Sequence, residues 1–207
     1  MAMNSKWDER YNIEEYRYGE TPNLFFKEII DTFPAGKILL PAEGEGRNGV
    51  YAAKRGWIVD AFDQSVQAKE KALRLAQKNN VNITYKVMSF EDTTNNYLSD
   101  SYDVIALTYV HLPEQIKEKS LSSLMPLLKI GGHIIIEGFH KDHFKYQQQN
   151  PKAGGPPHVG MMYSKHEILS FFASLEVILL EEKEIELSEG VGHNGKSSVL
   201  RFIGKKI

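Results

Sequence analysis

Residues 38–49 read ILLPAEGEGRNG, an apolar run followed directly by a glycine-rich loop. Gly44, Gly46 and Gly49 satisfy the pattern G-x-G-x-x-G. Glycines at these positions let the backbone turn sharply and approach a ligand closely. The apolar run predicts a buried strand and residues 47–55 predict a helix. The loop therefore joins a strand to a helix, as it does in nucleoside-binding α/β sheets.

An acidic residue follows the glycine loop at an informative distance. Residues 57–62 (WIVDAF) predict a second strand, and Asp63 comes directly after it. Asp63 lies 19 residues after Gly44 (63 − 44 = 19), close to the spacing of about 20 between such a loop and a ribose-binding acid. A carboxylate at this point accepts hydrogen bonds from both ribose hydroxyls. The combination predicts a nucleoside cofactor.

Strand and helix signals alternate on both sides of this unit. Ser65 caps a predicted helix that runs to about residue 79. Apolar runs predict further strands at 83–87, 103–107 and 133–137, the last after a turn at Gly131 and Gly132. Two more helices are predicted, one after Pro22 with Phe26, Ile29, Ile30 and Phe33 on one face, the other after Pro113 with Leu121, Leu124, Met125 and Leu128. Five strands alternating with helices predict a parallel sheet covered on both faces.

The last part of the chain departs from this alternation. Residues 164–167 (SKHE) form a capping-box pattern that predicts another helix. Two strands near 175–187 and 197–204 then follow each other across the glycine-rich segment 188–196, so they predict an antiparallel hairpin. We therefore expect a single domain over residues 1–207 with an α/β fold. It would be a doubly wound three-layer α/β/α sandwich with a mainly parallel seven-stranded sheet and a C-terminal antiparallel hairpin.

The composition excludes several classes of protein. The chain has 207 residues, a formal net charge of −2 and 42% hydrophobic residues, which is ordinary globular usage. It has no cysteine, which excludes disulfides, thiolate zinc sites and cysteine nucleophiles. The longest apolar runs are too short to span a bilayer, and the first residues lack the apolar core of a signal peptide. We expect a cytoplasmic protein with no membrane or nucleic-acid partner.

The charge of the loop distinguishes between cofactors. A dinucleotide places its pyrophosphate on the helix N-terminus, and Glu43 and Glu45 would repel it there. These two acids tolerate S-adenosylmethionine, which has no phosphate and carries a sulfonium and an ammonium group. The chain also has no Tyr-x-x-x-Lys pair, which argues against a short-chain dehydrogenase. S-adenosylmethionine is therefore the expected cofactor.

Three stretches carry a resemblance to a known family. Residues 44–48 (GEGRN), 61–65 (AFDQS) and 128–132 (LKIGG) resemble the class I S-adenosylmethionine-dependent methyltransferases. The loop GEGRN, together with residues 7–11 (WDERY) and 16–19 (YRYG), is similar to the tellurite-resistance and thiopurine-methyltransferase-like branch. The resemblance covers essentially the whole chain and implies a methyltransferase of small molecules.

The resemblance implies a set of cofactor-binding residues. Gly44 and Gly46 would pass close to the homocysteine part and Asp63 would hold the ribose. Leu40 stands where these enzymes often have an acid, and we expect nearby Glu43 to contact the methionine ammonium. The full expected set is Tyr18, Glu43, Gly44, Gly46, Arg47, Asn48, Asp63, Gln64, Ser65, Ser89, Phe90 and Thr108.

The methyl acceptor is expected at the end of the fourth strand, residues 108–113 (TYVHLP). This segment lacks the Asn/Asp-Pro-Pro-aromatic motif, which disfavours methylation of the amino groups of bases. His111 is the best-placed candidate base, since an imidazole titrates near neutral pH. By the family resemblance, His193 lies in a hairpin loop that reaches the active site. A base is needed only if the acceptor must lose a proton, and each histidine has an alternative structural interpretation.

Two segments are expected to cover the site. Residues 1–21 would form a lid whose aromatic residues suit a sulfonium. The irregular stretch 140–163 would form a loop over the acceptor. His140 and His143 flank Asp142 in this loop, but their spacing and the lack of a third ligand favour a solvated polar loop, and no metal site is predicted.

The sequence leaves the acceptor open. The resemblance favours a soft nucleophile, such as a thiol or a selenium or tellurium anion. The alternatives are a non-catalytic cofactor-binding module, an NAD-type oxidoreductase and an RNA methyltransferase. Both a monomer and a homodimer are compatible with the sequence.

Overall fold

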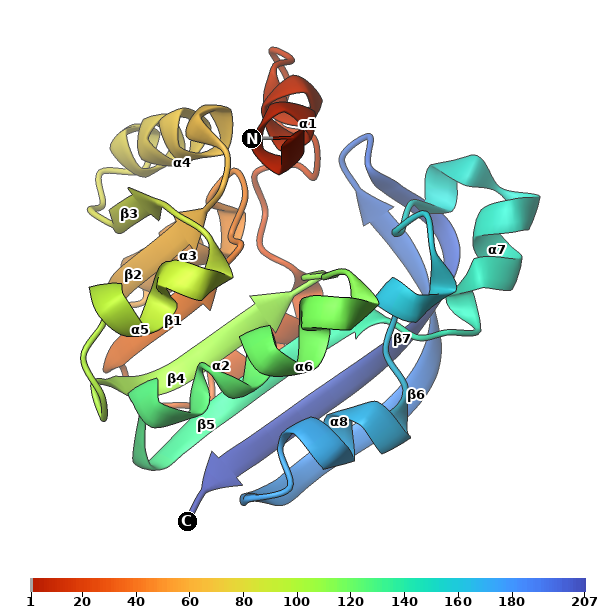
Figure 1. Ribbon diagram of the computed structural model, residues 1–207. Helices are drawn as coiled ribbons and strands as arrows, with labels where there is room; N and C mark the ends of the chain where they lie inside the picture. The colour runs from red at the N-terminus through yellow and green to blue at the C-terminus, as the bar shows by residue number, and fades with distance from the viewer. Residues whose placement is uncertain (1) are drawn as a thin grey trace.

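The computed structural model describes the backbone of residues 2–207 and the side chains from Lys6 onward. Its centre is a seven-stranded sheet with the order β3-β2-β1-β4-β5-β7-β6 (Figure 1). The first five strands are parallel, β7 runs antiparallel to β5, and β6 runs antiparallel to β7. The strands are β1 (Lys37–Pro41), β2 (Ile58–Asp63), β3 (Thr84–Val87), β4 (Tyr102–Thr108), β5 (Leu128–Phe139), β6 (Leu175–Glu189) and β7 (His193–Lys206). The expected fold class is confirmed.

Side chains that alternate along the central strands build a separate core on each face. Leu39 and Ile105 belong to one buried cluster, whereas their neighbours Ile38 and Val104 belong to the other. Strands buried on both faces read as continuous apolar runs, which is why they are visible in the sequence. Helices α6 (Glu114–Ser122) and α8 (Lys165–Phe171) pack on the first face, and α2 (Leu24–Ile30), α3 (Arg47–Lys54) and α4 (Val66–Lys78) pack on the second.

Two helices begin with the expected capping side chains, and two helices end earlier than predicted. The side chain of Asn23 caps α2 by accepting from the N–H of Phe26, and Ser65 caps α4 in the same way. Helix α2 ends at Ile30, so Phe33 lies outside it. Helix α6 ends at Ser122 because Pro126 has no N–H to continue it. Residues 125–127 form a 3₁₀ turn instead, and Leu128 opens β5.

Gly131 and Gly132 do not form the turn that the sequence predicted. Both lie inside β5, which starts five residues earlier than expected (133 − 128 = 5). Gly131 has φ 79°, a left-handed conformation that suits glycine. A Cβ atom on Gly132 would lie 3.1 Å from the carbonyl oxygen of Asp103 in the adjacent strand β4. The glycines therefore allow an irregular but continuous strand.

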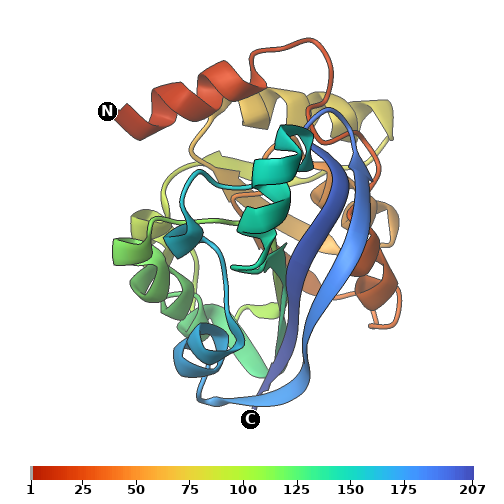
Figure 2. The same cartoon turned by 90° about the vertical axis from the view of Figure 1, so that its right-hand side faces the viewer.

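The two segments that were expected to cover the site, a lid and an irregular loop, both contain helices. Helix α1 (Ala2–Tyr11) lies in the N-terminal segment, and α7 (His143–Gln149) with two 3₁₀ turns lies within 140–163. Figures 1 and 2 show α1 beside α4, across the edge where the parallel strands end. The hairpin is longer than predicted, and residues 190–192 alone connect β6 to β7. Among the described residues, none of the helices has the length and apolar character needed to cross a membrane.

Candidate active site

Asp63 lies against the glycine loop at the carboxyl ends of the parallel strands. Its Oδ2 accepts the N–H of Gly44 at 3.2 Å, and its Oδ1 accepts the N–H of Ser65 at 2.9 Å. Burial raises the pKa of Asp63 to about 6, although these amides favour its charged form. A carboxylate has about four acceptor positions, so room for a ribose hydroxyl remains. The predicted juxtaposition of the loop and Asp63 is present.

The two loop glycines are required by close packing. Gly46 has φ 89°, and a Cβ atom there would lie 2.6 Å from the Cβ of Ala72 on α4. A Cβ atom on Gly44 would lie 2.8 Å from the hydroxyl of Tyr11. The N-terminal segment therefore reaches the glycine loop directly.

Glu43 caps helix α3 instead of standing free. Its Oε1 accepts the N–H groups of Asn48 at 2.9 Å and Gly49 at 2.7 Å. Burial raises the pKa of Glu43 to about 7, against the effect of these amide contacts. One carboxylate oxygen of Glu43 is therefore already bound to the helix N-terminus. A contact between Glu43 and the methionine ammonium stays a prediction.

Glu45 has a buried partner that sequence analysis missed. Lys71 on α4 lies 2.6 Å from Glu45, and both side chains are almost fully buried. The same lysine donates to the carbonyl oxygen of Glu15, and Glu45 accepts the N–H of Arg17 at 2.7 Å. Lysine within the buried stripe of an amphipathic helix was the available signal. Because Lys71 compensates Glu45, the acidic loop is a weaker argument against a pyrophosphate than it looked.

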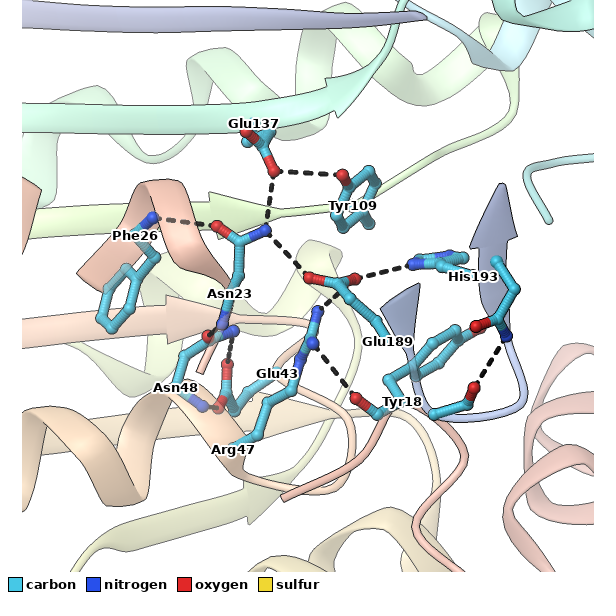
Figure 3. Close-up of polar contacts among 12 residues, drawn as sticks. Tyr18, Asn23, Phe26, Glu43, Arg47, Asn48, Tyr109, Glu137, Glu189 and His193 are labelled. Atoms are coloured by element: carbon cyan, nitrogen blue, oxygen red, sulfur yellow. Dashed lines mark hydrogen bonds and ion pairs between the residues drawn. The ribbon is translucent and has the colours of Figure 1, made fainter. Parts of the chain in front are cut away.

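Two expected cofactor contacts, Arg47 and Asn48, have partners within the protein. Arg47 pairs with Glu189 at 2.9 Å and donates to the carbonyl oxygen of Tyr18 at 3.1 Å (Figure 3). Asn48 accepts the N–H of Asn23 at 2.9 Å. These two residues join the glycine loop to the N-terminal segment and the hairpin. Their polar groups are committed to that scaffold rather than directed at a ligand.

Ser65 is committed in a similar way. It caps α4, and its hydroxyl donates to Asp8 at 2.6 Å. Asp8 also accepts the N–H of Gln67 at 3.3 Å, so this acid on α1 docks on the N-terminus of α4. Ser65 therefore holds the N-terminal helix.

The other expected contacts border the same edge. Phe90 is buried, and its ring packs edge-on against Phe62 with centroids 5.3 Å apart. Ser89 pairs with Asp92, whose carboxylate accepts its hydroxyl at 2.9 Å. Gln64 and Thr108 are half-buried at the ends of β2 and β4. Phe90 therefore has a position in the core.

His193 stands across the site in a dyad with Glu189 (Figure 3). Its Nδ1 lies 3.0 Å from the Glu189 carboxylate, and its ring packs on Tyr18 and Tyr109 with centroids 4.5 and 4.6 Å away. Burial lowers the pKa of His193 despite that contact. Burial opposes ionisation of Glu189, but His193 and Arg47 together lower its pKa to about 2. A neutral imidazole that donates through Nδ1 presents Nε2 as a proton acceptor.

His111 does not have the geometry of a base. Its Nδ1 lies 3.1 Å from the carbonyl oxygen of Met161, and its Nε2 accepts the N–H of Phe139 at 3.2 Å. Burial lowers the pKa of His111 to about 3. With both nitrogens bound to backbone, the ring joins the segment after β4 to β5 and to the loop 140–163. The structural interpretation of His111 therefore fits, and the expected catalytic one does not.

The loop 140–163 is packed rather than solvated at His143. Its ring is fully buried and stacks on Phe139 at 3.9 Å, and its Nε2 lies 3.1 Å from the carbonyl oxygen of Gly154. The rings of His111 and His193 contact the same phenylalanine at 5.4 and 5.1 Å. Phe139 therefore brings three histidines together. Among the described residues, no three or more His, Cys, Asp or Glu side chains are arranged so that they could hold a metal ion.

Tyr109 is a site residue that sequence analysis missed. It has φ 53°, an unusual conformation for an aromatic residue, at the position after β4. Its hydroxyl donates to Glu137 at 3.0 Å, and Glu137 also accepts from Asn23 at 2.6 Å (Figure 3). Glu137 pairs with Arg201 at 2.6 Å as well. Strain of this kind persists where the surroundings over-determine a residue, and it is frequent at functional sites.

The chain matches a family model for a methyltransferase domain over residues 38–132. No curated protein matches the sequence. One similar solved structure has a TM-score of 0.81 and 14% identity, covering 99% of this chain and 91% of that chain. That protein is described by the conversion of a disulfide bond into a thioacetal group during echinomycin biosynthesis.

Two further solved structures are similar. TehB from Haemophilus influenzae has a TM-score of 0.72 and 17% identity, covering 99% of this chain and 67% of its own. The magnesium protoporphyrin IX methyltransferase of Synechocystis has a TM-score of 0.68 and 12% identity, covering 100% and 95%. At these identities the likeness shows the fold. The chain therefore carries a methyltransferase domain in residues 38–132 and has the class I S-adenosylmethionine-dependent methyltransferase fold.

Proposed function

We propose that this protein transfers a methyl group from S-adenosylmethionine to a small-molecule acceptor. The observation that carries the proposal is the position of Asp63, fixed by the Gly44 amide at the edge where the parallel strands end. This edge is where ligands bind in open α/β sheets. The methyltransferase domain match covers the same loop and acid.

The residues at the edge fit the cofactor. Asp63 would supply ribose-binding oxygens, and Gly44 and Gly46 let the loop pack directly against Tyr11 and α4. The side chain of Tyr11 is buried beside this loop. When bound, the cofactor supplies the reactive methyl group as a sulfonium, and the protein has to orient it and exclude water. Helix α1 covers this edge, which is consistent with the second task.

His193 is the residue we propose for proton transfer on the acceptor side. Glu189 fixes its tautomer, and Arg47 holds Glu189 in turn. This arrangement leaves Nε2 to accept a proton from a thiol or hydroxyl. An acceptor that is already an anion needs no base. His111 has no free nitrogen and is left out of the proposal.

The proposed acceptor is a soft nucleophile, a thiol or a selenium or tellurium anion. The resemblance of the loop GEGRN supports this class. One structurally similar protein is described by a change at sulfur, the conversion of a disulfide bond into a thioacetal group. We also propose a cytoplasmic location and no nucleic-acid partner. Salt-dependent RNA binding would contradict the last point.

Calorimetric titration with S-adenosylhomocysteine, with NAD⁺ in parallel, tests the proposal. Micromolar binding of S-adenosylhomocysteine alone is the expected result, and a screen of thiols, selenite and tellurite as methyl acceptors follows. Binding of NAD⁺ alone would overturn the cofactor assignment. Cofactor binding without turnover of any acceptor would favour a non-catalytic cofactor-binding module.

A further inference from the structure

Arg10 on α1 has a buried nitrogen with nothing to bind. Its Nε is buried and makes no hydrogen bond. The guanidinium lies over the ring of Trp7, 5.1 Å from its centroid. Within the part of the chain that the structure describes, no carboxylate forms an ion pair with it, although Arg47, Lys71 and Arg201 are each compensated by an acid. A partly buried guanidinium without an acid is unfavourable.

Arg10 lies beside the cofactor loop, and its charge also acts on the acceptor side. The next residue, Tyr11, places its hydroxyl against Gly44. On the other side, the charge of Arg10 is one of the causes, after burial, that lower the pKa of His193. Asp8, two residues earlier on the same helix, docks α1 on α4. The helix therefore holds Arg10 next to the residue that contacts the cofactor loop, within electrostatic reach of His193.

The other cations show that the pattern is not general. Lys71 has Glu45 at 2.6 Å, and Arg47 has Glu189 at 2.9 Å. Arg17 also has an unpartnered Nε, but its backbone has a structural role: its N–H donates to Glu45, and its carbonyl oxygen accepts from the hairpin. The planar fork of a guanidinium matches a carboxylate or a similar oxyanion with two parallel hydrogen bonds. An anionic group on a ligand would supply what Arg10 lacks.

We propose that Arg10 binds a small anionic group of the ligand at the junction of the cofactor and acceptor sites. This inference rests on the proposed function and deepens it. The anion has two possible sources: the carboxylate of the cofactor's methionine part, or the charge of an anionic methyl acceptor. Both would be held by the same guanidinium, and binding experiments distinguish them.

The first arm compares two ligands that differ by one carboxylate. S-adenosylhomocysteine and its decarboxylated analogue are titrated into wild type, Arg10→Met and Arg10→Lys. If the cofactor is the source, Arg10→Met weakens S-adenosylhomocysteine by about 10- to 100-fold, the range of a charge-assisted hydrogen bond. The decarboxylated analogue binds wild type and Arg10→Met equally. Arg10→Lys keeps the charge but loses the planar fork, so its affinity for S-adenosylhomocysteine falls between those of wild type and Arg10→Met.

The second arm uses protein saturated with S-adenosylhomocysteine. Mercaptoacetate, which carries a carboxylate, and neutral 2-mercaptoethanol are titrated into each variant. If the acceptor is the source, Arg10→Met weakens mercaptoacetate alone. Arg55→Met is the matched control, because Arg55 is 54% exposed at the far end of α3 and pairs with Asp31. Thermal unfolding confirms that each variant is folded.

The outcomes separate this inference from the proposed function. Wild type that binds no S-adenosylhomocysteine contradicts the proposed function itself. Wild type that binds it normally, with Arg10→Met indistinguishable in both arms, overturns the role of Arg10. A loss that is equal for carboxylate-bearing and neutral ligands also overturns it, because it would show that Arg10 only packs α1.

Discussion

Several buried carboxylates are held differently in the cofactor half of the site, around the glycine loop and Asp63, and in the acceptor half, around Glu137 and Glu189. In the cofactor half, Asp63 and Glu43 accept backbone N–H groups that lie 2 to 19 residues away in sequence. In the acceptor half, Glu137 pairs with Arg201 across 64 residues, and Arg47 with Glu189 across 142. The first kind of contact is built into a loop and a helix N-terminus. The second exists only once distant strands have been assembled.

This difference predicts where a substitution is most damaging to stability. Arg201→Met leaves Glu137 as a buried charge without its partner, since the Glu137 side chain is 2% exposed. We expect a loss of about 3–5 kcal/mol in the free energy of unfolding. Urea denaturation measures it. The double variant Arg201→Met/Glu137→Leu should recover part of the loss, and no recovery would show that shape rather than charge is at stake.

His193 and His111 allow a second comparison within the acceptor half. We expect His193→Gln to slow methyl transfer to a thiol by about 100-fold, the lower end for loss of a general base. Affinity for S-adenosylhomocysteine should stay unchanged. The rate difference should shrink as pH rises and the thiol ionises. A loss that is constant across the pH profile would contradict proton transfer by His193.

His111→Gln is the matched comparison for His193. His111 binds the backbone of Met161 and Phe139, and its replacement leaves buried groups unpaired at a cost of about 1–3 kcal/mol. We expect lower stability and an almost normal rate in the folded protein. Thermal unfolding and single-turnover kinetics on the same sample separate these effects. A large loss of rate without a loss of stability would instead support a catalytic role for His111.

The glycine loop of the cofactor half is expected to be sensitive through packing. Gly46→Ala places a Cβ atom 2.6 Å from Ala72 at a φ of 89°, whereas Gly131→Ala has a φ of 79° and nothing within 4 Å. The second variant measures backbone strain alone, about 1 kcal/mol. We expect Gly46→Ala to cost about 1–3 kcal/mol more, because α4 must shift. Equal losses in the free energy of unfolding, measured by urea denaturation, would show that α4 shifts at no cost.

The same contrast explains what the sequence could predict. The strands, the glycine loop and Asp63 follow from apolar runs and one spacing, because their contacts are local. Tyr109, Glu137 and Lys71 went unnoticed, since their partners are far away in sequence. His111 attracted attention by its residue type, but its two backbone contacts decide its role. Helix α1 has no strong apolar period, and its place is set by docking of Asp8 on α4.

A substitution at Asp63 tests ribose binding in the cofactor half, with the smallest expected effect on affinity. We expect Asp63→Asn to weaken S-adenosylhomocysteine by about tenfold, because a charge-assisted hydrogen bond to the ribose becomes a neutral one. Calorimetry measures the affinity. Unchanged affinity in the folded variant would remove Asp63 from the ribose site.

The pKa of Asp63 adds a prediction for the ligand-free protein. Burial raises the pKa from 3.8 to about 6, so the folded state binds the proton more tightly than the unfolded state between these values. The contribution of Asp63 to stability is therefore fully present below about pH 4 and is lost as the pH rises to about 6. Asparagine does not titrate. The free energy of unfolding of Asp63→Asn relative to wild type should thus rise between pH 4 and pH 6 and then stay level. The same difference in the S-adenosylhomocysteine complex should be shifted to lower pH, because a ribose that donates to the carboxylate favours its charged form. A difference that does not vary with pH in either state would mean that the Gly44 and Ser65 amides already hold Asp63 ionised.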